Sequence, residues 1–164
     1  MTTTVLRATS SPAFLSLVPH LLECTPHRSL VVVPFREGRS LGAMRVDLPP
    51  QGDQATEEGV ASTVVGMACK VTRTDAVAIA VYTDGSVTDG AGAPHAGLVD
   101  AVRARADICG LRVIDALVVG SDGWTSYLEP AAAAHPLSEI QDAAFEGLDH
   151  DVSGDHLAAA RLPV

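Results

Sequence analysis

Apolar residues recur along the chain with two spacings, one typical of helices and one typical of strands. Helical spacing predicts helices over residues 11–25, 57–73, 95–109 and 137–148. Continuous or alternating apolar runs predict strands over residues 5–8, 29–35, 44–48, 76–82, 111–119 and 124–128. The two patterns alternate, which is typical of a sheet with helices packed on it.

Two stretches of the chain share one construction. Residues 14–49 and 98–130 each contain a helix, an apolar strand, a polar turn and a second strand that ends at a proline. Right-handed crossovers make each βαβ pair parallel, and short turns make each hairpin antiparallel. The sequence therefore predicts an α/β fold: a single-layer mixed sheet of about six strands, flanked by helices and built from two βαββ halves.

The length of 164 residues suits one domain with a sizeable core. We expect residues 1–148 to form this single α/β domain and residues 149–164 to form a polar, loosely ordered tail. The strand over 76–82 alternates alanine with larger residues, so its alanine face leaves room for a closely packed helix. The predicted core contains Val31, Val33, Met67, Ile79, Val81 and Val118.

Charge and hydropathy narrow the class of protein. The formal net charge is −9, whereas a nucleic-acid partner requires a basic face, so we expect no nucleic acid to bind. No apolar run approaches the ~20 residues that span a bilayer, and the N-terminus is a poor signal peptide. The prediction is a cytoplasmic protein with no membrane partner.

Cys24, Cys69 and Cys109 form an odd set without the CxxC spacing of a zinc site or the pairing of a disulfide framework. We predict core or near-core thiols in a reducing compartment, no metal site and no cofactor. His150 and His156 stand beside acidic residues in the predicted tail, but their spacing lacks a rigid element that would hold a metal.

Two charged residues interrupt an otherwise apolar strand. Arg45 and Asp47 lie one strand repeat apart and therefore share a face. One interpretation is a polar catalytic site, in which the arginine fixes an anion and the aspartate acts as a base, with Tyr127 of the second hairpin nearby. The other is a structural ion pair or a solvated face.

The loop over residues 83–94 follows a strand and precedes a helix, as a phosphate cradle does. It lacks the lysine of a P-loop, and Asp84 and Asp89 would repel a phosphate. We expect a mobile surface loop; Asp84 as a magnesium ligand is the alternative.

The hairpin strand over 124–128 carries Trp124 and Tyr127 but no charge, and it is the last strand in chain order. Such a strand is expected at a sheet edge, where it must be covered by the final helix or paired with another copy. Trp124 and Tyr127 are therefore candidate partner-binding residues.

Two functions of different classes follow. The first is a non-enzymatic binding or self-assembly module, with a homo-oligomer or another protein as partner. The second is a small-molecule hydrolase or transferase that uses a cleft around Arg45, Asp47 and Tyr127.

Five segments in order resemble one known family. They are VPHLLECTPHRSLVVV (18–33), MRVDLPP (44–50), AVAIAVY (76–82), LVDAVRARADICGLRVIDALVV (98–119) and WTSYLEP (124–130). The set is similar to the actinobacterial family known as domain of unknown function 4192, over roughly residues 14–148. The chain departs from that pattern at Glu23 and Cys24, where members have Gly-Phe. The resemblance implies an actinobacterium or its phage as source and implies no activity.

Overall fold

A computed structural model describes residues 10–71, 73–88, 93–129 and 133–140. The elements in chain order are α1 (Ser11–Leu22), β1 (Ser29–Arg36), β2 (Arg39–Ser40), β3 (Met44–Asp47), α2 (Gln54–Lys70), β4 (Ala76–Tyr82), α3 (Ala96–Ile108), β5 (Arg112–Val119) and β6 (Trp124–Ser126). Within these ranges no helix is both long and apolar enough to cross a membrane. The predicted strand over 5–8, most of the final helix and the tail lie outside the described residues.

The strands form one mixed sheet, which confirms the predicted α/β class. The order is β2–β1–β4–β5–β6, and β3 pairs with β1 on the same side as β2. β1 is antiparallel to β4, β4 is parallel to β5 through the α3 crossover, and β5 is antiparallel to β6. The parallel crossover and the antiparallel hairpins are thus as predicted.

The predicted strand over 44–48 is β3, and the segment predicted as the turn before it contains a further short strand, β2. Glu37 and Gly38 both have positive φ, as a two-residue turn between twisted strands requires, and lead from β1 into β2. Ser40 then pairs with Phe35, whereas Met44 pairs with Val32, so the outer strand holds one residue more than β1 between these pairs. This bulge separates β2 from β3.

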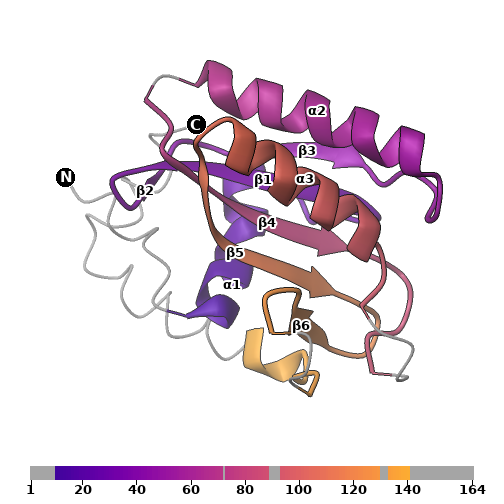
Figure 1. The fold of residues 1–164 in the computed structure, drawn as a ribbon. Coiled ribbons are helices and arrows are strands. Elements are labelled where there is room, and N and C mark those ends of the chain that lie inside the picture. The colour runs from indigo at the N-terminus through magenta and orange to yellow at the C-terminus, as the bar shows by residue number, and fades with distance from the viewer. Residues whose placement is uncertain (1–9, 72, 89–92, 130–132, 141–164) are drawn as a thin grey trace, which may run out of the picture.

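Helices cover both faces of the sheet (Figure 1). On one face α2 and α3 pack against each other and on Leu30, Ile79, Val81 and Val118. On the other face α1 packs on the alanine side of β4, as the alternation in that strand predicts. The two helix–strand–strand units therefore place α1 and α3 on opposite faces.

Five of the six predicted core residues are fully buried, but the prediction for Met67 is wrong. Met67 is 38% exposed. The buried side of α2 is instead formed by Ala61, Val64, Val65 and Ala68, together with Glu57. Because α2 packs against α3 as well as on the sheet, its buried side is turned toward α3, and Met67 lies on the flank that is left.

Candidate functional site: a cavity around Asp115

The first turn of α1 begins at a serine pair. Ser10 caps the helix by accepting a hydrogen bond from the Ala13 backbone N–H at 3.2 Å, and Pro12 in the first turn has no N–H to leave unpaired. Ser11 follows, and its Oγ donates a hydrogen bond of 2.6 Å to Oδ2 of Asp115 on β5. The start of α1 is thereby joined to a strand 104 residues later in the chain.

Asp115 reaches this position because β5 contains a bulge. Val77 of β4 pairs with Val113, but the next residue, Ala78, pairs with Asp115, so Ile114 is an extra residue in β5. In a regular strand Val113 and Asp115 would share a face. The bulge turns Asp115 to the opposite face, beside Ala78 and under α1.

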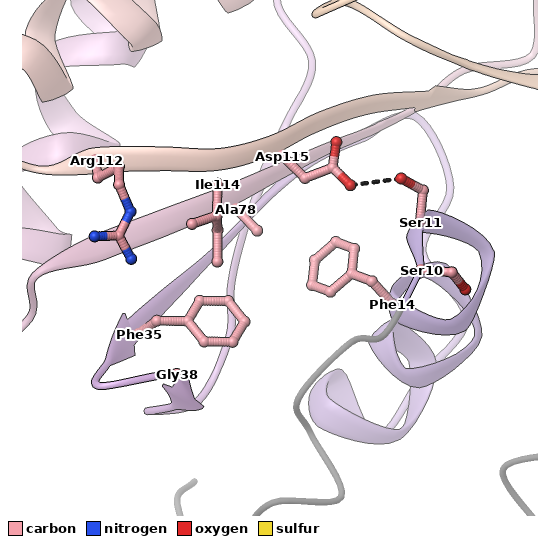
Figure 2. Close-up of a pocket in the computed structure, with 9 residues that line it drawn as sticks. All are labelled: Ser10, Ser11, Phe14, Phe35, Gly38, Ala78, Arg112, Ile114 and Asp115. Carbon is pink, nitrogen blue, oxygen red and sulfur yellow. Dashed lines mark hydrogen bonds between the residues drawn. The ribbon is translucent and has the colours of Figure 1, made fainter.

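A cavity of about 320 Å³ lies in front of this carboxylate. Figure 2 shows Ser11 and Asp115 at one end, the rings of Phe14 and Phe35 with Ile114 around the middle, and Arg112 at the other end. Arg112 is exposed and Ile114 is 40% exposed, so this side of the cavity meets solvent. The cavity is therefore apolar along its length with one charge of each sign, and its size suits a small ligand.

Burial raises the pKa of the Asp115 carboxyl above its ordinary value, against the opposite effect of the hydrogen bonds from Ser11 and from the Ala116 backbone N–H. The carboxylate is consequently a stronger proton acceptor than an exposed aspartate. Its hydrogen bonds within the protein do not fully replace the hydration that it loses on burial. A cation or a hydrogen-bond donor entering the cavity would supply the missing partner.

The predicted catalytic residues lie elsewhere and apart. Arg45 and Asp47 form an ion pair with each other at 2.8 Å on β3, with side chains 38% and 85% exposed. This is the structural alternative that the sequence left open. Tyr127 follows β6 at the other side of the sheet, where it is buried under α3 and its hydroxyl donates to the Pro94 carbonyl. The structure therefore does not bring Arg45 and Asp47 together with Tyr127.

The aromatic hairpin is covered by its own chain. Trp124 is 4% exposed and Tyr127 is 9% exposed. The backbones of Trp124 and His135 exchange two hydrogen bonds of 2.9 and 2.8 Å, and their rings stack with centroids 4.3 Å apart. The edge of β6 is thus closed by the segment at His135, so Trp124 offers no exposed aromatic surface to a partner.

A model of the family described as domain of unknown function (DUF4192) matches residues 12–162. The chain belongs to this family. The matched range begins at Pro12, so it contains all the residues that line the cavity except Ser10 and Ser11. No curated protein and no solved structure matches the chain. The actinobacterial or phage source stays a prediction.

The loop that resembled a phosphate cradle is held by an aspartate in this DUF4192 domain. Asp122 accepts hydrogen bonds from Ser86 and Thr88 side chains and, at 3.0 Å, from the Val87 backbone N–H. These bonds lower the pKa of Asp122 to about 2. Asp84 forms an exposed ion pair with Arg28 at 3.1 Å. Asp89 lies outside the described residues.

The cysteines are not core residues: Cys24, Cys69 and Cys109 are all exposed free thiols, contrary to the prediction. Burial and the neighbouring Cys109 thiol raise the pKa of Cys69. Among residues 10–140 that the structure describes, no three His, Cys, Asp or Glu side chains are grouped to hold a metal. His150 and His156 lie outside that part of the chain.

Neither Asp115 nor Ser11 is among the candidate residues that the sequence pattern indicated. A signal was present, since Asp115 is the one acidic residue in the apolar run of β5. The sequence could not show which face of the sheet the Asp115 side chain lies on, because strict alternation places it on the face covered by α2 and α3.

Proposed function

We propose that this DUF4192 domain is a non-enzymatic binding module and that its ligand occupies the Asp115 cavity. The ligand is a small molecule with an apolar body and a cationic or hydrogen-bond-donating group, which contacts Asp115. The single observation that supports this most is the bulge in β5, which turns a carboxylate from the direction expected of its strand into a cavity.

The arrangement is unfavourable for stability, which supports a role in binding. A carboxylate loses hydration when it is buried, and a buried polar site without full compensation costs free energy. The bulge also leaves Ile114 without a partner residue on β4 and 40% exposed. Features that lower stability without an evident structural gain tend to be functional sites.

The walls indicate the class of ligand. Phe14, Phe35 and Ile114 provide an apolar surface long enough for a ring or a branched chain. Arg112, at the far end from Ser11, would favour an anionic group on the same molecule (Figure 2). An amphiphilic amine of similar size fits the Asp115 end and the apolar walls, and an amine that carries a carboxylate at the opposite end of its apolar body would also reach Arg112.

Binding is favoured over hydrolysis by the surroundings of Ser11. A serine nucleophile requires a base and donors for the developing oxyanion. The first-turn N–H groups of Ala13 and Phe14 are already bound to Ser10, and Pro12 has none. No histidine lines this cavity in the described part of the chain. A Ser11 and Asp115 hydrolase is therefore the second candidate.

Three matched probes test the proposal: phenethylamine, 3-phenylpropionate and 4-(2-aminoethyl)benzoate, titrated into the labelled protein and followed by amide chemical shifts. We expect phenethylamine and 4-(2-aminoethyl)benzoate to shift the amides of Ser11, Phe14, Ile114 and Asp115, and 3-phenylpropionate to act weakly through Arg112. If none of the three shifts these amides, or if shifts scatter over the surface, the cavity is not a binding site for this class of ligand.

We further propose that the domain acts in the cytoplasm. Its three free thiols are exposed, and exposed thiols persist in a reducing compartment. Thiol titration of protein purified from its own host should give three reactive thiols per unfolded chain. Blocked thiols would point to an oxidising compartment.

A further inference from the structure

The outer edge of β3 and one flank of α2 form a second surface that the cavity does not use. β3 pairs with β1 on one side and with no strand on the other, among the residues that the structure describes. Self-association was predicted at the edge of β6, but the segment at His135 pairs with Trp124 and covers that edge. The free edge is at β3 instead.

The backbone groups of β3 divide evenly between its two sides. Leu48 donates its N–H to Arg28 of the segment before β1, at 3.0 Å. Since strand residues alternate, Val46 and Met44 also direct their backbone groups to β1, and Arg45 and Asp47 direct theirs outward. The free edge therefore presents two N–H and two C=O groups, all on the two charged residues.

The charges on this edge are complementary to themselves. If a second copy pairs antiparallel with β3 around a two-fold axis at Val46, Arg45 of each copy lies opposite Asp47 of the other. The same register places the outward backbone groups of Arg45 and Asp47 in hydrogen-bonded pairs. Charges normally protect an edge from pairing, but opposite charges directly across two strands stabilise it.

An incompletely covered helix flank lies beside this edge. Val60 of α2 is half-buried and packs against the same core cluster as Met44, Val46 and Leu48. Met67, two helical turns further on, is 38% exposed. Cys69, on the other flank of α2, lies beside Cys109 at the end of α3, so the flank with Val60 and Met67 faces away from α3. Figure 1 shows α2 running over β3. None of the described residues fully buries this part of α2's apolar pattern.

We propose that two copies of the chain associate through β3 and this flank of α2, forming one continuous sheet across a two-fold axis at Val46. The β3 edges supply the hydrogen bonds and the paired charges. The flanks of α2, brought together above the joined edges, bury Met67 and the exposed part of Val60.

Charge reversals test the proposal through the mass in solution, measured by light scattering after size exclusion. The wild type is expected to be a dimer. Arg45→Glu places like charges opposite each other and should give a monomer, and Asp47→Arg should do the same. An equimolar mixture of the two variants should form a heterodimer, because an acidic edge then meets a basic one.

The mixture distinguishes the proposed dimer from an effect of the Arg45–Asp47 ion pair within one chain. Neither variant can form that ion pair, so only contacts between two copies can restore the dimer in the mixture. Arg105→Glu on α3 is the matched control: it makes the same change in net charge at an exposed site and should leave the dimer intact. Met67→Lys should weaken the dimer without unfolding the monomer, as a thermal melt can check. A monomeric wild type, a mixture that stays monomeric or a control that dissociates would each overturn the proposal.

Discussion

The two faces of the sheet are covered differently, and the difference locates the candidate site. On one face two helices pack together over larger apolar residues, including Ile79, Leu98 and Val118, which have no exposed surface. On the other face α1 packs on the alanines of β4, and Ile140, at the end of the described residues, packs against the same cluster. Near the start of α1 its cover ends, and Asp115 with the exposed Ile114 borders a cavity.

The two faces differ in the kind of packing around their side chains. The face with α2 and α3 has the dense apolar packing that supplies most of a domain's stability. The face with α1 leaves room for a polar group that would be unfavourable in a sealed core. We infer that stability and ligand binding are divided between the two faces.

The largest expected effect is a loss of stability on the densely packed face. Leu98→Ala removes a fully buried side chain from α3 and should lower the free energy of unfolding by about 2–5 kcal/mol. Val31→Ala, on the α1 face, removes less of an equally buried side chain and should cost about 1–3 kcal/mol. Urea unfolding measures both. A larger loss for Val31→Ala than for Leu98→Ala would contradict this division.

Replacing the buried carboxylate should have the opposite sign. The pKa of Asp115 is raised in the folded chain, so its ionised form disfavours folding at every pH above that raised value. Asp115→Asn keeps an oxygen that can accept from Ser11, and should raise the melting temperature at neutral pH.

The gain should fade as the pH falls through the folded pKa of Asp115 toward its unfolded pKa, because the wild-type carboxyl is then protonated. Asp107→Asn, at an exposed carboxylate on α3, is the matched control. Equal melting shifts in both variants, or a lower melting temperature for Asp115→Asn at neutral pH, would show that burial of this carboxylate does not oppose folding.

The smallest expected effect concerns the loop held by Asp122. Its lowered pKa means that the bonds to Ser86, Val87 and Thr88 stabilise the fold above the ordinary aspartate pKa and are lost as the pH falls toward about 2. Asp122→Asn should speed hydrogen exchange at the Val87 amide and leave the melting temperature nearly unchanged. Asp84→Asn, in the same loop, should not affect Val87. Unchanged exchange in Asp122→Asn would show that this contact does not hold the loop.

The hydrophobic pattern was sufficient to predict most of the fold, because each strand and helix buries a face with its own period. The alanine side of β4 even indicated where α1 packs. Met67 was misplaced because helical spacing identifies a stripe but does not show that α3 would draw the buried side of α2 toward itself.

The candidate site was not predictable in the same way. Its two polar residues, Ser11 and Asp115, are far apart in the chain and meet only through tertiary packing. The direction of Asp115 depends on one extra residue in β5, and the bulge at Ile114 leaves no mark in the alternation of a single sequence. Asp115 is a charged residue inside an apolar strand, as Arg45 and Asp47 are, so the same pattern could have indicated it.

The most direct test of the binding proposal is the affinity of phenethylamine for the wild type and for Asp115→Asn, measured by calorimetry across the acidic and neutral pH range. The ammonium group requires the ionised carboxylate. The wild-type affinity should therefore rise as the pH increases through the pKa of Asp115 and then level off. Asp115→Asn should bind at least tenfold more weakly at neutral pH, whereas Asp107→Asn, at an exposed carboxylate on α3, should bind as tightly as the wild type. Equal, pH-independent affinity in the wild type and Asp115→Asn would contradict the assignment of the Asp115 cavity as the ligand site.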